Sequence, residues 1–296
     1  MDCKKTMSKK LESISKLRNV CQSPYWDPKG PLSETFNRLT YYKISIYFTW
    51  MFLHTIITPN QVTLLGLIVG LLGCVFITLP SYLPIIGVIL FQFWTIFDMV
   101  DGEIARYKNI CSLSGAFFDR LNTTIVESYF ILALSYSVYL KLSDWRVFIF
   151  GSFALIATLL LKIIFSYLHI AALEPILHRK HSEMFDHEKL NNFKNAQFLR
   201  DYLEGRPSSL FFKLAEFLIG YGVYIGLYCA VMLDVLLNYS LPILSFNINF
   251  SYFYLICLGT ILPIGIIYLI IYMIKNQAPE WMYFSIIQNF KQGKIK

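Results

Sequence analysis

Five carboxylates stand in two apolar stretches of this 296-residue sequence. Carboxylates are costly inside a membrane and are therefore functional candidates by default. Asp98, Asp101 and Glu103 end one stretch, and Asp119 and Glu127 lie in the next. Asp98 and Asp101 are three residues apart, which places both on one face of a helix. Asp119 and Glu127 are two four-residue steps apart, so they lie on one stripe of the following helix.

A short link joins the two stretches, so we expect them to pair as antiparallel helices and to bring their carboxylate faces together. Three carboxylates that converge near the membrane surface repel one another unless they are neutralised. A hard divalent cation with oxygen ligands, Mg²⁺ or Mn²⁺, is the natural neutraliser. The sequence therefore predicts a metal site at the facing ends of these helices.

Small residues and one arginine accompany the carboxylates. Gly102 follows Asp101, Ala105 lies one turn further on, and Gly115 opens the next stretch. Their missing side chains leave room for a bulky ligand near the metal. Arg106 supplies a planar fork suited to phosphate or carboxylate. A metal site, the Arg106 guanidinium and the open space beside them together favour a diphosphate substrate. Displacement at phosphorus needs compensation of the negative charge on the attacking and leaving oxygens.

The composition places this chemistry in a membrane. Hydrophobic residues make up 56% of the chain and charged residues 15%, whereas soluble chains average about 45–50% apolar and about 25% charged. A soluble enzyme of this length could not hide so much apolar surface. The net charge is +7, and the basic residues flank apolar spans. Membrane lipids with anionic headgroups explain them better than a nucleic acid does, so we expect no nucleic-acid partner.

The sequence predicts an all-α integral membrane fold with six transmembrane helices preceded by an interfacial amphipathic helix. A helix needs about 20 apolar residues to cross the bilayer. The amphipathic helix is expected at residues 34–55, which are apolar yet carry Arg38, Lys43 and His54; a seventh span is the alternative. The six spans are expected at residues 61–80, 83–105, 114–140, 146–173, 210–238 and 249–274.

Lysine and arginine counts orient the chain. With a cytoplasmic N-terminus, 22 of these residues lie on the cytoplasmic side and only Lys141 and Arg146 on the other. The positive-inside rule therefore predicts a multi-pass protein with both termini and the active site facing the cytoplasm. The expected organisation is a polar segment at 1–33, a membrane domain at 34–275 with a cytoplasmic insertion at 176–209, and a tail at 276–296.

The spacing of the motif residues resembles the signature of the CDP-alcohol phosphotransferases (CDP-alcohol phosphatidyltransferases). That signature reads D-x2-D-G-x2-A-R-x8-G-x3-D-x3-D, and seven of its eight fixed positions match this sequence with full spacing. The stretch Ile57–Thr63 ahead of the first span is also similar to the family's usual approach. The resemblance is good over about residues 35–140 and is architectural afterwards. The matching positions are Asp98, Asp101, Gly102, Ala105, Arg106, Gly115 and Asp119.

The resemblance implies a membrane enzyme that cleaves a CDP-linked alcohol, transfers the phosphoryl-bearing group to an acceptor alcohol and releases CMP. It implies one or two divalent metals on the three matched aspartates, commonly in a homodimer. CDP-diacylglycerol is the favoured donor by analogy with the family, in phospholipid or polar-lipid synthesis, and a soluble CDP-alcohol meeting a lipid alcohol is the reverse arrangement. Position matching assigns the nucleotide site to Gly102, Ala105, Arg106 and Gly115, with Asn60 and Thr63 as weaker candidates.

The sequence departs from the signature at Thr123, where the family has its last aspartate, a metal ligand and proposed general base. Threonine cannot take a proton at neutral pH. One hypothesis is an active enzyme in which another group, such as Glu127 one turn further on, accepts the proton, or in which none is needed. A second is a non-catalytic membrane protein that binds a CDP ligand or a partner. A third is lipid handling or transport in the same cavity.

Two further charges lie inside the predicted spans. Lys162 stands near the middle of the fourth span, where an isolated charge is expensive. It either binds the phosphate of an acceptor, or it snorkels or pairs with a carboxylate. Arg120 follows Asp119 but points about 100° away around the helix, where a phosphate contact or a structural ion pair is expected. For Glu127, hydrogen bonding to neighbouring hydroxyls is the structural alternative to the role of base.

Overall fold

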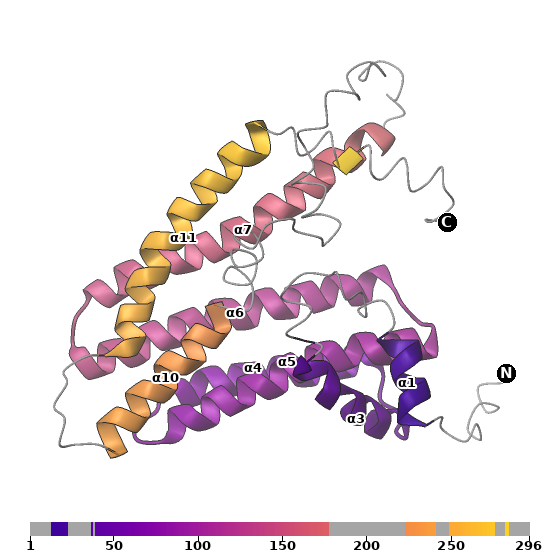
Figure 1. Ribbon diagram of the computed structural model, residues 1–296, viewed down its shortest axis with the longest axis horizontal. Helices are drawn as coiled ribbons and strands as arrows, with labels where there is room; N and C mark the ends of the chain where they lie inside the picture. The colour runs from indigo at the N-terminus through magenta and orange to yellow at the C-terminus, as the bar shows by residue number, and fades with distance from the viewer. Residues whose placement is uncertain are drawn as a thin grey trace. The chain divides into compact units, whose positions relative to one another are not determined.

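The computed structural model describes residues 13–22, 37, 39–177, 223–240, 249–275 and 282–283. The regular secondary structure of these residues is entirely helical, with no strand among them. The insertion at 176–209 falls almost entirely outside this range, as do residues 276–281 and 284–296 of the tail. The helices are α1 (Ile14–Cys21), α3 (Tyr41–Leu53), α4 (Pro59–Thr78), α5 (Leu83–Lys108), α6 (Leu113–Leu142), α7 (Arg146–Leu177), α10 (Val223–Ser240) and α11 (Phe250–Lys275) (Figure 1).

Five of these helices are long and apolar enough to cross a membrane, as expected for a multi-pass membrane protein. They are α4, α5, α6, α11 and residues 146–174 of α7. The fifth predicted span, 210–238, overlaps α10, whose apolar stretch Tyr228–Leu237 is shorter than a span. Residues 210–222 lie outside the described part of the chain, so the number of six spans stays a prediction. The 13-residue α3 occupies the predicted amphipathic segment, and its place at the membrane interface also stays a prediction.

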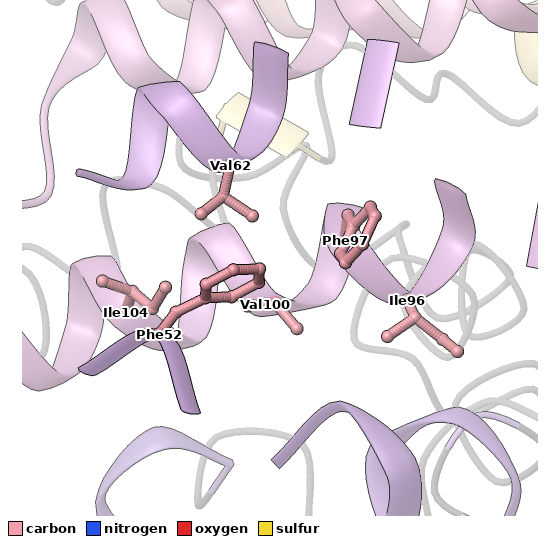
Figure 2. Packing of buried hydrophobic residues seen from close by; sticks show 6 residues of the cluster. All are labelled: Phe52, Val62, Ile96, Phe97, Val100 and Ile104. Carbon is pink, nitrogen blue, oxygen red and sulfur yellow. The ribbon is translucent and has the colours of Figure 1, made fainter. Parts of the chain in front are cut away.

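The first compact unit of the chain contains α1, α3 and the parts of α4, α5 and α6 that carry the motif. One apolar cluster joins the end of α3, the start of α4 and one face of α5 (Figure 2). Close packing of α4 requires Gly70, because a Cβ there would lie 2.7 Å from the Val126 side chain. The buried members of the cluster are Phe52, Val62, Ile96, Phe97, Val100 and Ile104.

Helix α5 ends at Lys108, three residues beyond its predicted end. The next residue, Asn109, adopts a left-handed conformation (φ 53°) that terminates the helix. The amide of Ile110 donates back to the carbonyl of Ala105 at 3.0 Å, which is the bonding pattern of a Schellman cap. Lys108 then donates to the carbonyl of Ile57 at 2.9 Å. This bond ties the end of the motif helix to the loop that precedes α4.

The second compact unit contains α7, α10, α11 and the remainder of α6. Within it, α11 packs against both α7 and α10. Asp234 of α10 is buried and accepts the amides of Phe250 (2.6 Å) and Ser251 (2.9 Å) at the start of α11. These two bonds satisfy amides that a helix N-terminus leaves without an intrahelical partner. Asp234 is therefore a structural residue in this unit.

Replacing Gly259 should destabilise the second unit. A Cβ at Gly259 would lie 2.6 Å from the backbone oxygen of Phe150 in α7, so Gly259→Ala must push α11 away from α7. We expect a loss of about 1–3 kcal/mol in the free energy of unfolding, measured by thermal unfolding in detergent. Gly265→Ala on the same helix is the matched control, since a Cβ there meets nothing within 4 Å. Equal stability of the two variants would contradict this account of the packing.

Candidate active site

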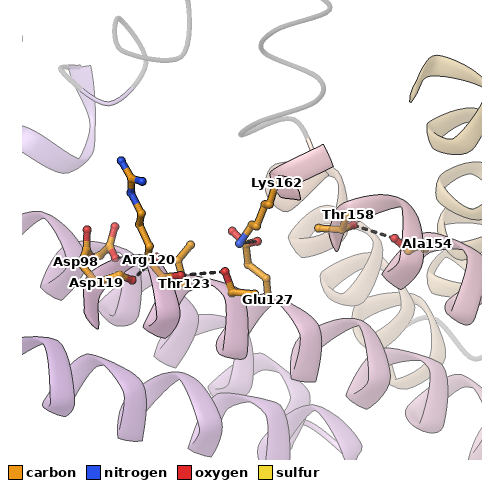
Figure 3. A network of polar contacts seen from close by, with 9 residues as sticks. Asp98, Asp119, Arg120, Thr123, Glu127, Ala154, Thr158 and Lys162 are labelled. Atoms are coloured by element: carbon orange, nitrogen blue, oxygen red, sulfur yellow. Dashed lines mark hydrogen bonds and ion pairs between the residues drawn. The ribbon is translucent and has the colours of Figure 1, made fainter. Parts of the chain in front are cut away.

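The centre of the candidate site is a pair of carboxyl groups from two helices. Asp98 on α5 and Asp119 on α6 lie side by side, within hydrogen-bonding reach of each other (Figure 3). Thr123 stands one turn after Asp119 and donates its hydroxyl to Asp98 Oδ1 at 3.3 Å and to the Asp119 carbonyl at 3.1 Å. The pairing of α5 and α6 thus brings together the motif's first and third aspartates and Thr123, the residue at which the sequence departs from the signature.

Asp101, the second motif aspartate, is buried and close enough to interact electrostatically with both Asp98 and Asp119. Its Oδ2 accepts the hydroxyl of Thr63 on α4 at 2.5 Å. Thr63 is therefore a direct partner of a motif aspartate, and α4 supplies a wall of the site. The spacing of three between Asp98 and Asp101 accounts for their common face on α5.

The donor set fits a hard divalent cation. Two carboxyl groups in contact repel when both are ionised, so they need a shared proton or a cation between them. Asp119 Oδ1 is buried and has no hydrogen-bond partner among the described residues. As the side chains stand, the described residues hold no ready group of three His, Cys, Asp or Glu ligands. The fit therefore rests on Asp98 and Asp119, with Asp101 engaged by Thr63.

Arg106 lies folded back along α5 over Gly102. A Cβ at Gly102 would approach the guanidinium to 3.1 Å, so the glycine leaves the space that the arginine occupies. The Nε of Arg106 donates to the carbonyl of Cys21 at 2.7 Å. Ala105, the preceding motif residue, is half-buried on the same helix. The guanidinium of Arg106, the predicted phosphate-binding group, thus lies next to Gly102 and is hydrogen-bonded to the Cys21 carbonyl.

Gly115 and Asn60 are also brought together. A Cβ at Gly115 would lie 3.4 Å from Asn60 Oδ1 and 3.1 Å from the hydroxyl of Ser112. The amide of Gly115 donates to that same hydroxyl at 3.0 Å, at the start of α6. The weaker candidate Asn60 therefore stands beside a motif glycine, at the N-terminus of α4.

The two charges deeper in the predicted spans pair with each other. Lys162 on α7 forms an ion pair with Glu127 on α6 (Figure 3). Glu127 is buried, with 8% of its surface exposed. Pairing with a carboxylate is one of the alternatives that the sequence left open for Lys162. The roles of Glu127 as a base and of Lys162 as a phosphate ligand stay predictions. Arg120 is exposed and extends its guanidinium away from Asp98 and Asp119 (Figure 3).

Glu103, for which the sequence predicted no specific role, lies at the centre of a polar cluster. Its carboxylate is fully buried and accepts three bonds, from Gln22 (2.7 Å), Ser45 (2.6 Å) and Thr49 (2.5 Å). The three donors come from α3 and from the residue that follows α1. The available signal was the presence of this carboxylate inside the motif, between Gly102 and Ala105.

Comparisons with known proteins agree with the motif. Residues 56–200 match the sequence model of the family described as CDP-alcohol phosphatidyltransferase. Three curated proteins, each named a bifunctional IPC transferase and DIPP synthase, are similar to part of the chain. The Aquifex aeolicus protein is 33% identical over 125 residues. The Thermococcus kodakarensis protein is 36% identical over 81 residues, and the Archaeoglobus fulgidus protein 37% over 99 residues.

These similarities are partial in length. They cover 42%, 27% and 32% of this chain in the order given above. They cover 27%, 18% and 19% of the relatives' own lengths. The matched region of 56–200 contains every motif residue from Asn60 to Asp119, and also Thr123 and the ion pair of Glu127 with Lys162.

Removing the lysine of the buried ion pair should destabilise the protein more than removing both charges. Lys162→Met leaves the buried Glu127 carboxylate without its cation. We expect a loss of about 1–3 kcal/mol in the free energy of unfolding, below the 3–5 of a fully buried pair because Lys162 is 32% exposed. Unfolding in detergent is the measurement.

The double variant Lys162→Met with Glu127→Gln is the matched control, because it removes both charges together. We expect it to recover most of the lost stability. A double variant as unstable as Lys162→Met alone would show that the ion pair is not what the single variant disrupts.

Proposed function

We propose, from the match of residues 56–200 to the family model described as CDP-alcohol phosphatidyltransferase, that this chain is a membrane phosphotransferase that uses a CDP-linked alcohol. It transfers the phosphoryl-bearing group to an acceptor alcohol and releases CMP. The observation that carries the proposal is the contact between Asp98 and Asp119. Three relatives whose names include transferase and synthase support the reaction class.

The proposed metal ligands are Asp98, Asp119 and Asp101. A divalent cation bound there, Mg²⁺ or Mn²⁺, would neutralise the carboxylates and offset charge on the diphosphate. The buried Oδ1 of Asp119, which has no hydrogen-bond partner in the described part of the chain, supports this assignment. Thr63 holds Asp101 in place through its hydroxyl. The sequence alone leaves open whether one or two metals bind. Of the three carboxylates, Asp98 and Asp119 are in contact with each other.

The proposed reaction is an in-line displacement at the phosphorus that carries the donor alcohol. The acceptor oxygen forms a bond to this phosphorus, and the bridging oxygen of the diphosphate leaves with the bonding electrons as part of CMP. Arg106, turned over Gly102, is suited to orient the diphosphate. Asn60 and Gly115, which lie beside each other, would border the nucleotide. No residue of the chain forms a covalent intermediate in this scheme.

The proton of the acceptor hydroxyl needs a destination, and Thr123 cannot provide it at neutral pH. Asp119 is our candidate, through the carboxylate oxygen that the metal would leave open. Glu127 is less suited, because its carboxylate is engaged by Lys162. The Thr123 hydroxyl instead donates to Asp98, which keeps that carboxylate turned toward Asp119.

The substrate assignment extends the family analogy. We propose CDP-diacylglycerol as the donor and a small polar alcohol as the acceptor, with a cytoplasmic site in a homodimer. The five apolar helices support a lipid-linked substrate, since an acyl chain can stay in the bilayer while its headgroup reacts. A soluble CDP-alcohol and a lipid acceptor are the reverse arrangement that an assay must include.

Asp98→Asn and Asp119→Asn should each abolish metal-dependent CMP release, because each removes a ligand of the proposed metal and half of the carboxyl pair. We expect losses of at least about 100-fold, within the range of a lost acid–base or electrostatic contribution. The assay is CMP release by protein in detergent with Mn²⁺ or Mg²⁺. It offers CDP-diacylglycerol or soluble CDP-alcohols with pooled acceptors.

The matched control is Glu174→Gln, which removes one negative charge from an exposed position of α7 and should leave the rate unchanged. Metal-dependent release that persists in both aspartate variants would contradict the metal assignment. Absence of release from the folded wild-type protein with every donor would favour the non-catalytic alternative that the threonine at 123 raises.

Thr123→Asp tests the departure from the signature. The new carboxylate would replace a hydroxyl that lies 3.3 Å from Asp98 Oδ1, so a third ligand would join the Asp98 and Asp119 pair. We expect the Mn²⁺ concentration for half-maximal CMP release to fall about tenfold, equivalent to about 1.4 kcal/mol. Thr123→Asn is the uncharged control. An unchanged metal requirement would show that position 123 does not reach the metal.

A further inference from the structure

The buried Glu103 carboxylate joins three segments of the first compact unit. Its Oε1 accepts the amide of Gln22 and the hydroxyl of Ser45, and its Oε2 accepts the hydroxyl of Thr49. Gln22 also donates to the carbonyl of Tyr42 at 2.9 Å. Hydrogen bonds to an ionised acceptor are among the strongest available to a protein. One carboxylate on the motif helix therefore holds α3 and the end of α1.

Apolar contacts reinforce this attachment. Leu17 and Cys21 of α1 form a fully buried cluster with Ile46 of α3, and Leu53 and Tyr107 pack against it. Tyr107 belongs to α5 and follows Arg106 directly. The apolar face of α1 thus packs against α3 and the end of the motif helix. The hydrogen bonds of Glu103 connect the same three helical segments.

The end of α1 in turn reaches the motif. Cys21 is the last residue of α1, and its carbonyl accepts a hydrogen bond from the Nε of Arg106 at 2.7 Å. The last carbonyls of a helix lack intrahelical partners and carry the negative end of the helix dipole, so they favour a cation. This bond holds one edge of the guanidinium, whose other nitrogens lie over Gly102.

We propose that Glu103 is a positioning residue, whose buried carboxylate fastens α1 and α3 to α5 and thereby holds the Cys21 carbonyl against Arg106. Glu103 acts through α1 and does not touch the substrate. Its consequence for the reaction rests on the proposed function, in which Arg106 orients the diphosphate. The attachment of α1 itself is independent of any reaction.

Cys21 provides a direct reporter of this attachment. Its side chain is 0% exposed, and burial raises the pKa of its thiol to about 12, so a maleimide should label it very slowly at neutral pH. If α1 detaches, the thiol becomes accessible and ordinary in acidity. The experiment uses the full-length protein in detergent, with Cys3, Cys74, Cys111, Cys229 and Cys257 replaced by alanine so that Cys21 is the sole cysteine.

Glu103→Leu removes all three acceptor bonds, and we expect Cys21 to be labelled about 10- to 100-fold faster. Glu103→Gln keeps a carbonyl oxygen that can accept from Gln22 and Ser45. Its labelling rate should therefore lie between the rates of the wild type and of Glu103→Leu. Gln22→Ala cuts the link at the end of α1 and keeps the carboxylate in place, so it serves if Glu103→Leu does not fold. Glu174→Leu makes the same change at an exposed position and should leave the rate unchanged.

The KM for the CDP donor gives the second readout. With α1 detached, Arg106 loses its orienting carbonyl, so we expect KM to rise about 5- to 10-fold in Glu103→Leu and Gln22→Ala with a smaller change in kcat. Unchanged Cys21 labelling in both variants would overturn the proposal. Faster labelling with an unchanged KM would overturn the positioning role. A wild-type protein without CMP release would refute the proposed function, while the labelling rates would still decide whether Glu103 holds α1.

Discussion

The contact between the Asp98 and Asp119 carboxyl groups is the constraint on which the candidate site depends. Two like charges this close, on helices apolar enough for a membrane, cannot both remain ionised without compensation. An apolar surrounding strengthens their repulsion, since it screens charge less than water does. A shared proton or a divalent cation relieves it, and a cation also attracts a diphosphate. The costly feature of the fold is thus the feature that suits phosphoryl transfer.

The helices around this pair are held by short polar bonds at their ends and by small residues in their packing. Thr63 fixes Asp101 to α4, and the absent side chain of Gly70 lets α4 approach Val126 of α6. Gly102 similarly leaves room for the Arg106 guanidinium. Under the proposed function, rigid placement of these groups matters, because a site that receives both a metal and a diphosphate would tolerate little displacement of them.

Much of this site follows from sequence spacing, because helix periodicity and a short link decide which faces of α5 and α6 meet. The short link between α5 and α6 predicted that Asp98 and Asp119 would lie close together, and they do. Asn60 also lies next to Gly115. Helix α1 was not predicted, since eight residues in a polar segment give a weak periodic signal. The roles of Glu103 and Asp234 were also missed. Both bind partners distant in sequence, and no local pattern encodes such pairings.

Direct binding of Mn²⁺ tests the central claim without requiring the acceptor to be known. Electron paramagnetic resonance of the purified protein titrated with Mn²⁺ reports the free ion, so bound metal appears as a loss of signal. The account predicts a saturable site that disappears in Asp98→Asn and in Asp119→Asn but persists in Glu174→Gln. Equal binding by all four proteins, or none by the wild type with and without a CDP-linked donor, would contradict it.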